Sequence, residues 1–407
     1  MAAGGKSLSA LGLTARGGAD AIVTGLAVDS RDVKQGYLFA ALPGTKVHGG
    51  EFIQDALRMG AAAILTDVEG AEIAKDELAG STAAVVIAAD PRQTLAFCAA
   101  LWFEQQPDTV VAVTGTNGKT SVASFVRRIW QLLGIPAVNL GTTGVEGDWQ
   151  APLMHTTPEP IPLHRALAGA ADAGINHAAM EASSHGLAQR RLDGVNLRAA
   201  GFTNFTQDHL DYHESFEAYF DAKAGLFARV LPEDGIAVIN IDDARGVDML
   251  AIARARGQET MTVGRDTGAD MVLLGQRFDA TGQDVRIKFG GETFQTRLNL
   301  VGGFQAENVM VAAGLVIASG VTPDRVFSVL PELETVRGRM QLAATRSNGA
   351  AVYVDYAHTP DAVGPGDALL MCGKGHETGQ IVGDTVYPFD DVEQASVAVA
   401  ALDGKLA

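Results

Sequence analysis

The chain has 407 residues, of which 47% are hydrophobic, and its 31 basic and 48 acidic side chains give a net charge of −17 at pH 7. This length exceeds what one hydrophobic core usually supports, so two or three domains are expected. The acidic balance opposes binding to nucleic acid, which requires a basic surface. The two cysteines, Cys98 and Cys372, are too few for a disulfide framework or a zinc cluster and indicate buried thiols in a reducing compartment.

No targeting or membrane segment is expected. The N-terminus, "MAAGGKSLSALGLTARGG", lacks the long apolar core of a secretory signal. No apolar run approaches the length of a membrane span. We therefore expect a cytoplasmic protein without membrane insertion.

The first hundred residues alternate short apolar runs with helical periods. "AIVTGLAVDSRDVKQGYLFAALPG" predicts a strand, a loop and a strand, while "FIQDALRMGAAAILT" and "PRQTLAFCAALWFEQ" contain helix and strand periods. The segment "EQQPD" is a candidate linker, because Pro107 cannot continue the preceding helix. We predict a first domain at residues 1–107.

The middle of the chain alternates strands with helices. The strand-like runs "TVVAVTG", "HAAMEAS", "LRAAGFTNF" and "GIAVINID" are separated by the helical stretches "PLHRALAGAADAG" and "ESFEAYFDAKAGLFARVL". This alternation predicts an α/β fold with a mostly parallel sheet covered on both faces. A β-rich stretch at 259–300 and the helix "GFQAENVMVAAGLVIASG" complete a predicted second domain, 108–338, and leave 339–407 as a short third domain.

A short glycine-containing loop joins strand and helix in "VVAVTGTNGKTSVASFV". The common phosphate loop, G-x-x-x-x-G-K-[ST], would have its first glycine where Val113 stands, whereas Gly115 lies two residues nearer the lysine. Gly115 and Gly118 allow the backbone N–H groups to approach a ligand closely. Lys119 adds a positive charge and Thr120 a hydroxyl ligand for magnesium. A phosphate cradle is predicted; the alternative is a plain strand-to-helix turn capped by a threonine.

Candidate metal ligands follow downstream. Glu181 ends a predicted strand, on the side where α/β sheets bind ligands. Carboxylate, imidazole and threonine hydroxyl groups suit magnesium beside a nucleotide. The alternatives are a salt-bridged Glu181, a helix-capping His213 and a solvated Lys223. The stretch "NFTQDHLDYHESFEAYFDAKAGLF" supplies five further candidates: Asp208, His209, Asp211, His213 and Lys223.

Taken together, these motifs resemble the Mur ligases and, among them, the MurE type. "TGTNGKTS" is similar to the Mur-type phosphate loop, and "DHLDYH" followed by "AK" is particularly MurE-like. The resemblance covers about residues 20 to 362 and resumes from about residue 366. It implies a three-domain α/β architecture with a central P-loop parallel-sheet domain and a truncated, Rossmann-like third domain.

The resemblance also implies a reaction. A MurE-type enzyme is an ATP-dependent amide-bond ligase that adds the third amino acid to UDP-N-acetylmuramoyl-L-alanyl-D-glutamate (UDP-MurNAc-L-Ala-D-Glu) in peptidoglycan synthesis. Its partners are this nucleotide peptide, ATP and a diamino acid, meso-diaminopimelate more commonly than L-lysine. The D-glutamyl carboxylate becomes an acyl phosphate, which the incoming amine attacks. Mg²⁺ is the implied cofactor.

The family's nucleotide and catalytic residues map onto this sequence as follows. Thr120 and Glu181 would hold one Mg²⁺, and Glu181 with His209 the second. Lys223 would be carbamylated to N6-carboxylysine, an anion beside the metal. Gln305 replaces the asparagine that is common in the adenine motif. The implied catalytic residues are Lys119, Glu181, His209 and Lys223. The implied ATP-binding residues are Gly115, Thr116, Asn117, Gly118, Lys119, Thr120, Ser121, Asn308, Arg339 and Asp355.

Three further motifs imply contacts with the UDP-muramoyl peptide. "DSRDVKQGYLFAALPG" is similar to the segment that holds the uridine nucleotide, and "HTTPEP" and "MEASSHGLAQRR" to loops that hold the muramoyl peptide. The implied substrate-binding residues are Val28, Ser30, Thr45, Lys46, Thr156, Thr157, Ser183, Gln189 and Arg191.

The resemblance is interrupted after "VDYAHTPDA". Ala362 runs through "VGPGD" into "ALLMCGKGHE", so the family's "GGDRD" segment and its Asp-Asn-Pro-Arg motif are missing. Gly373 and Glu377 remain as candidates for holding the amino acid, without their arginine partners. A shortened homologue, an engineered or mis-assembled deletion, and a sequence that omits part of the true chain all remain open explanations.

Two other functions remain open. One is a catalytically impaired homologue that binds a nucleotide or the UDP-muramoyl peptide. The other is a different Mur-like ligase, such as a folylpolyglutamate or cyanophycin synthetase relative. The uridine-type N-terminal segment and "DHLDYH" argue against that second alternative.

Overall fold

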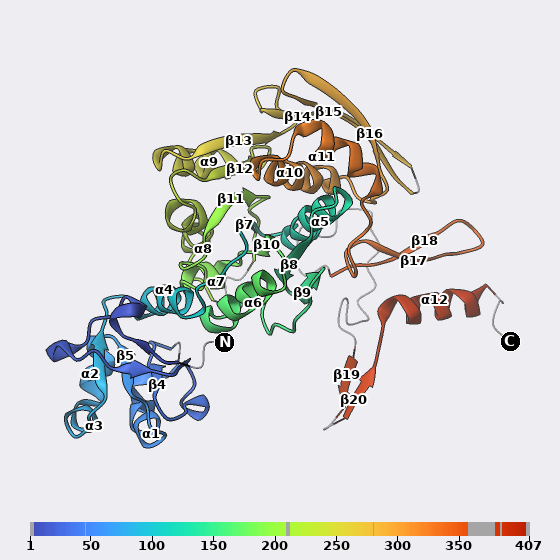
Figure 1. The fold of residues 1–407 in the computed structure, drawn as a ribbon. Helices are drawn as coiled ribbons and strands as arrows, with labels where there is room; N and C mark the ends of the chain where they lie inside the picture. Colours follow the sequence, from blue (N-terminus) through green and yellow to red (C-terminus); the bar gives the residue numbers. More distant parts are fainter. Residues whose placement is uncertain are drawn as a thin grey trace.

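A computed structural model describes residues 4–44, 46–208, 212–279, 281–356, 379–382 and 385–403. Figure 1 shows a small sheet with its helices at the N-terminal end, a large central sheet, and a group of short C-terminal elements. No helix in these described ranges is both long and apolar enough to cross a membrane.

The N-terminal group is built on a four-stranded parallel sheet with the order β3-β4-β5-β6. Its strands alternate with helices, as the sequence periods predict. Hydrophobic clusters cover both faces of the sheet, one including α4 and the other α1. The elements are β1 Lys6–Ser7, β2 Ile22–Val23, β3 Gly25–Ala27, β4 Tyr37–Ala40, α1 Ile53–Arg58, β5 Ala63–Thr66, α2 Val68–Ile73, α3 Lys75–Ala79, β6 Ala84–Ile87 and α4 Pro91–Phe103.

The central group contains a ten-stranded sheet with the order β16-β15-β14-β13-β12-β11-β7-β10-β8-β9. The strands from β14 to β8 run parallel, and antiparallel strands extend both edges. The predicted, mostly parallel sheet is therefore confirmed. Its strands are β7 Thr109–Thr114, β8 Ala137–Gly141, β9 Gly144–Gly147, β10 His177–Glu181, β11 Leu197–Phe202, β12 Ile236–Asn240, β13 Glu259–Gly264, β14 Met271–Asp279, β15 Gly282–Phe289 and β16 Glu292–Leu298.

Helices cover both faces of this central sheet (Figure 1). Alternate residues of each buried strand point to opposite faces, so Val111 and Val113 contact one hydrophobic cluster, and Val110 and Ala112 the other. The first cluster includes α5, α10 and α11, and the second α6 to α9. The helices are α5 Lys119–Leu132, α6 Pro160–Asp172, α7 Ser184–Ala188, α8 Phe216–Gly225, the π-helical turn Leu226–Val230, α9 Gly246–Ala255, α10 Phe304–Ala318 and α11 Pro323–Val329.

The N-terminal and central groups are joined by the packing of α4 against α6. Ile161 of α6 belongs to the same hydrophobic cluster as Leu95 and Ala99 of α4. Polar contacts flank this core: the Arg190 Nε atom donates to Asp90 at 2.9 Å. The helix pair therefore fixes the small sheet to the large one through a buried apolar contact with polar contacts at its side.

The C-terminal group has little core of its own among its described residues. The helix α12 packs against β17, and the Ser396 hydroxyl donates to the Ala343 carbonyl at 2.9 Å. Val399 is the one buried residue of α12, whereas the side chains of Val397 and Leu402 are exposed. The elements are β17 Gln341–Thr345, β18 Ala351–Val354, β19 Gly379–Val382, β20 Thr385–Pro388 and α12 Asp391–Leu402.

The prediction of buried thiols is confirmed for Cys98 and cannot be compared with the structure for Cys372. Cys98 is buried on α4, and burial raises the pKa of its thiol to about 12, as expected for an inert core cysteine. Cys372 lies outside the described residues.

His164 makes the junction between α4 and α6 sensitive to acid. Its ring is fully buried, and among the described residues neither ring nitrogen has a hydrogen-bond partner. Burial lowers the pKa of His164 from 6.5 to about 4. Between these two values the unfolded chain binds more protons than the folded chain, so stability falls as the pH drops.

We predict that His164→Leu removes the part of the acid destabilisation that His164 causes between pH 6.5 and pH 4. That part is worth about 3 kcal/mol at full protonation. Thermal unfolding midpoints measured across this pH range would test it. His155→Gln, at an exposed histidine, is the matched control. Parallel pH profiles for the His164→Leu and original chains would contradict the prediction.

Candidate functional site

The loop between β7 and α5 needs glycine at two positions. Gly115 has φ +151° and Gly118 has φ +88°, both in a region that side chains disfavour. A Cβ on Gly115 would lie 1.9 Å from the Thr203 hydroxyl oxygen, and one on Gly118 would lie 2.4 Å from Asn308 Oδ1. The two glycines therefore let the loop pass close to Thr203, which follows β11, and to Asn308 of α10, and no side chain covers the backbone at these two positions.

Residues just after β11 hold this loop in place. Asn204 Oδ1 accepts from the Asn117 N–H at 2.8 Å, and Asn204 Nδ2 donates to the Asn117 carbonyl at 3.2 Å. The Thr203 hydroxyl donates to the same carbonyl at 2.6 Å. The Thr206 N–H donates to the Thr116 hydroxyl at 3.0 Å. The loop is thus preorganised by a neighbouring strand end, independently of any ligand.

Two lysines converge on one backbone carbonyl of the loop. Lys119 Nζ donates to the carbonyls of Gly115 at 2.9 Å and Thr116 at 2.8 Å. Lys223 Nζ, from α8, donates to the same Gly115 carbonyl at 2.7 Å. Burial lowers the pKa of both amines, and the charge of Lys119 lowers that of Lys223 further, well below its ordinary value. Burial and the charge of Lys119 therefore both disfavour the charged form of the Lys223 amine, which is not the solvated charge that was the alternative.

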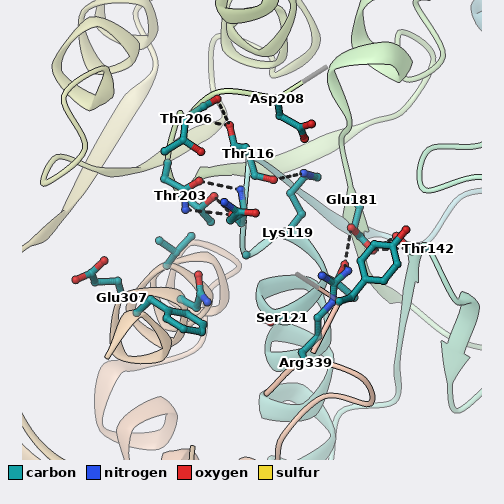
Figure 2. A pocket seen from close by; sticks show the side chains of 18 of the residues that line it. Thr116, Lys119, Ser121, Thr142, Glu181, Thr203, Thr206, Asp208, Glu307 and Arg339 are labelled. Atoms are coloured by element: carbon teal, nitrogen blue, oxygen red, sulfur yellow. Dashed lines mark hydrogen bonds between the residues drawn. The ribbon is translucent and has the colours of Figure 1, made fainter. Parts of the chain in front are cut away.

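Glu181 lies at the carboxyl end of β10, opposite the start of α5 (Figure 2). Its Oε2 accepts from the Thr120 hydroxyl at 2.9 Å, and its Oε1 accepts from the Thr142 N–H at 3.0 Å. Burial raises the pKa of Glu181, and the Thr142 N–H and the charge of Lys119 oppose that rise. A buried carboxylate is costly unless positive charge lies near it, and Lys119 and Arg339 supply such charge beside Glu181.

An arginine from the start of the C-terminal group reaches this site. Arg339 Nη2 donates to the Thr120 hydroxyl at 3.1 Å. Its guanidinium carbon lies 4.8 Å from the centre of the Tyr356 ring, and the Asp355 carboxylate accepts from the Met340 N–H at 2.8 Å. Figure 2 shows the Arg339 side chain beside Glu181 and Thr142. Groups from two structural units therefore meet at the first turn of α5.

These groups line one cavity of about 670 Å³, which is in the size range of small-molecule sites. Asn308 lies on its α10 side, where Asn308 Nδ2 donates to Gln305 Oε1 at 3.1 Å. The sequence-predicted residues that line the cavity are Thr116, Asn117, Gly118, Lys119, Thr120, Ser121, Thr156, Glu181, Ser183, Asp208, Lys223, Asn308, Arg339 and Asp355.

Other predicted residues lie away from this cavity lining. The buried Thr157 hydroxyl bridges the backbone, donating to the Glu181 carbonyl and accepting from the Ser183 N–H, both at 2.9 Å. Arg191 donates to Gln189 Oε1 at 2.7 Å. His213 is buried among aromatic rings rather than capping α8, whose cap is Ser215.

The remaining predictions concern the two ends of the chain and one short segment. Val28, Ser30 and Lys46 belong to the N-terminal group, with Val28 and Lys46 exposed. The residues that lie outside the described part of the chain are Thr45, His209, Asp211, Gly373 and Glu377.

The sequence analysis missed Thr142, Asn204 and Tyr356 as cavity residues. Thr142 follows the end of β8 and Asn204 follows that of β11. Polar residues directly after parallel strands are a signal that could have found the first two, because these strand ends meet at one edge of the sheet. Tyr356 contacts the site through Arg339, and no local pattern predicts that contact.

Comparisons with known proteins agree with this geometry. The family description "Mur ligase middle domain" matches residues 113–316, and "Mur ligase family, catalytic domain" matches residues 22–102. The chain belongs to the Mur ligase family. The matches cover the N-terminal sheet and the central sheet that carries the phosphate loop.

Individual Mur ligases align with most of the chain. It is 36% identical to a UDP-N-acetylmuramoyl-L-alanyl-D-glutamate–2,6-diaminopimelate ligase of Brucella melitensis, covering 93% of this chain and 94% of that protein. It is 38% identical to the protein of the same name from Caulobacter vibrioides, covering 94% and 97%. A solved structure of a ligase of that name matches with a TM-score of 0.71 at 30% identity, covering 84% and 68%.

The Brucella alignment spans 467 positions, which exceeds the 407 residues of this chain. Part of that relative therefore has no counterpart here. This agrees with the family segments that the sequence lacks after Ala362.

The two hydrogen bonds between the Asn204 side chain and the backbone of Asn117 form a clamp that should limit the motion of the loop. Asn204→Ala removes both hydrogen bonds to Asn117, so the loop amides should exchange with solvent about tenfold faster, the equivalent of one or two lost hydrogen bonds. Hydrogen–deuterium exchange of a peptide spanning 113–119 would measure this. Asn299→Ala, which removes a side-chain hydrogen bond to Pro331, is the control and should leave the loop unchanged. Equal loop exchange in both variants would refute the clamp.

Proposed function

We propose that this chain is an ATP-dependent ligase that adds a diamino acid to UDP-MurNAc-L-Ala-D-Glu, with meso-diaminopimelate favoured over L-lysine. The observation that carries the proposal is the convergence of Lys119, Lys223, Glu181 and Arg339 on one glycine-bounded loop. The choice of substrate rests on the similarity of the chain to diaminopimelate ligases. We place the reaction in the cytoplasm, because ATP is available there.

The phosphates of ATP would lie over the loop and the first turn of α5. The uncovered backbone and the helix N-terminus supply N–H donors and partial positive charge. Lys119 and Arg339 would neutralise charge on the transferring phosphoryl group. Lys119 would exchange its loop carbonyls for phosphate oxygens when ATP enters. Asn308, on α10, would face the adenine and Asp355 the nucleotide from the other side.

The residues present fit Mg²⁺. The Thr120 hydroxyl and the Glu181 carboxylate lie in contact and face the cavity, and both are oxygen ligands. The described residues contain no cluster of three or more His, Cys, Asp or Glu side chains, which suits an ion that takes its remaining ligands from water and phosphate. Thr120 and Glu181 would hold one ion, and Glu181 with His209 a second. Bound Mg²⁺ would supply charge neutralisation for phosphoryl transfer.

Lys223 would act as a carbamate. Burial and the charge of Lys119 lower the pKa of its amine, and the neutral amine has the lone pair needed to attack carbon dioxide. The nitrogen forms a bond to the carbon of CO₂ and loses a proton, giving an anionic N6-carboxylysine. A carbamate places an anion beside the Lys119 cation, where a protonated Lys223 would repel it.

The proposed chemistry has two steps. An oxygen of the D-glutamyl carboxylate attacks the γ-phosphorus of ATP, and ADP leaves with the bonding electron pair. The amine of the diamino acid then attacks the acyl carbon, phosphate leaves, and the nitrogen loses a proton to give the amide. Thr156 and Ser183 line the cavity with Glu181 and would orient the peptide. Gln189 and Arg191, which lie outside that lining, would contact the peptide beyond it.

The uridine end of the substrate would lie on the N-terminal group, at Val28, Ser30, Thr45 and Lys46. Gly373 and Glu377 would contact the diamino acid. Two observations favour a second candidate, a binding homologue without ligase activity: the C-terminal group has little described core, and the family's Asp-Asn-Pro-Arg motif is missing.

The test is ADP release by the full chain with UDP-MurNAc-L-Ala-D-Glu, ATP and Mg²⁺, with and without meso-diaminopimelate or L-lysine. We expect release that depends on meso-diaminopimelate and yields a tripeptide product. Lys119→Ala should lower the rate at least about a hundredfold, because it removes a cation aimed at the phosphates. Lys288→Ala, at an exposed lysine on β15, is the control. Nucleotide binding without amide product would favour the binding homologue, and full activity in Lys119→Ala would sink the phosphate-loop assignment.

A second prediction tests the carbamate. Lys223→Ala should lose ligation and regain part of it when a short carboxylic acid such as acetate is added, because the free carboxylate can occupy the vacated space. Lys119→Ala should gain nothing from the same acid. An unimpaired Lys223→Ala variant would rule out the proposed role.

A further inference from the structure

The structure has a second cavity, of about 440 Å³, beside α5. It is bounded by the middle of α5, by the β9 hairpin and by residues 334–337, which lead into the C-terminal group. The two cavities share no lining residue, but Thr142 lines one and Thr143 the other. The volume is sufficient for a small metabolite.

Charged side chains of both signs line this second cavity. The cations are Arg127 and Arg128 of α5 and Arg337 of the connecting segment. The anions are Glu146 of β9 and Glu334. Three guanidinium groups facing two carboxylates suit a ligand that has both a carboxylate and an ammonium group.

Several of these groups lack a partner. Within the described part of the chain, the side chains of Arg128, Glu146 and Glu334 make no hydrogen bond or ion pair. Arg127 donates through Nη1 to Gln131 at 2.9 Å, which leaves Nη2 available. The Ser124 hydroxyl also lines the cavity; it is 4% exposed and is unpartnered among the described residues. Of these groups the Ser124 hydroxyl is buried, and a buried hydroxyl is normally satisfied, so its lack of a partner points to a ligand. Arg128 and Glu146 are half-buried and Glu334 is exposed.

We infer that this cavity is an effector site for a small zwitterion of the amino-acid class. The carboxylate would lie between Arg127 and Arg128, and the ammonium group would lie at Glu146. The inference uses the charges of the cavity and does not depend on the ligase reaction. It also differs from a simple anion site, because Glu146 and Glu334 would repel a ligand without a positive group.

The connecting segment gives the site a route to the first cavity. Arg337 lines the second cavity and pairs with Asp390 at 2.6 Å, whereas Arg339, two residues later, donates to Thr120. A ligand that touches both α5 and residues 334–337 would favour the arrangement that keeps Arg339 beside Thr120. That arrangement adds positive charge near the loop, so occupancy should tighten nucleotide binding.

The experiment is isothermal titration of the full chain with three probes of similar length. L-lysine has a carboxylate and ammonium groups, glutarate has only carboxylates, and cadaverine has only ammonium groups. The variants are Arg128→Gln and Glu146→Gln, whose side chains leave no broken ion pair behind. Arg198→Gln, at an exposed arginine of β11 outside both cavities, is the matched control. The affinity for a non-hydrolysable ATP analogue is measured with and without saturating L-lysine.

We expect L-lysine to bind at least about tenfold more tightly than glutarate or cadaverine, as two charge-assisted contacts predict. Each cavity variant should lose most of that affinity, and Arg198→Gln none. Saturating L-lysine should tighten binding of the ATP analogue by about fivefold in the original chain and not in Glu146→Gln. Equal binding of the three probes, or lysine binding that survives both variants, would overturn the site. An unchanged or weakened affinity for the analogue would overturn its effector role. Failure of the analogue to bind without lysine would instead count against the proposed nucleotide site.

Discussion

The carbonyl of Gly115 is the point on which the site depends, because it accepts hydrogen bonds from both Lys119 and Lys223. Two ammonium groups at one buried acceptor repel each other, and water cannot screen them there. The repulsion and the burial push the Lys223 amine towards its neutral form. That chemical state follows from the path of the backbone, since only a glycine can pass so close to Thr203 at this point.

The order of strands in the central sheet explains why these groups meet. β7 lies between β10 and β11. The chain passes from β7 to β8 on one side, and later crosses from β10 to β11 on the other side of β7. A crevice forms where connections diverge at the carboxyl ends of parallel strands. Glu181 at the end of β10 and Asn204 after β11 border that crevice, and the loop after β7 occupies it. The same strand order thus positions the carboxylate, the clamp and the phosphate loop.

Much of this arrangement could be predicted from the sequence, because the periods of strands and helices are local properties. The apolar run before Gly115 and the placement of Glu181 at a strand end were predicted correctly. The clamp by Asn204 and the reach of Arg339 to Thr120 could not be predicted, because both contacts join residues far apart in the chain. The domain limits and the roles of individual residues remain predictions.

The burial of Lys223 is a second feature that the sequence does not predict. On a helix such as "ESFEAYFDAKAGLF" a lysine normally extends into solvent, and the pattern gives no sign of burial. In the structure the lysine is 1% exposed, and its amine lies 4.5 Å from the centre of the Tyr219 ring. α8 packs against α7, and the Lys223 amine reaches the Gly115 carbonyl; both are tertiary contacts that the local sequence does not show.

The C-terminal group is held by polar contacts more than by an apolar core. Arg337 pairs with Asp390 and Arg346 with Asp403, while α12 buries one side chain among its described residues. The Arg337–Asp390 pair is exposed, and such pairs contribute little stability and weaken as salt is added, whereas the Asp403 side chain is buried. The cavity beside the loop after β7, in contrast, is lined mainly by the central sheet and its helices. Among the described residues of the C-terminal group, Arg339, Met340, Asp355 and Tyr356 line it. The part of the cavity formed by the central sheet therefore does not depend on the packing of the C-terminal group, whereas the contact between Arg339 and Thr120 does.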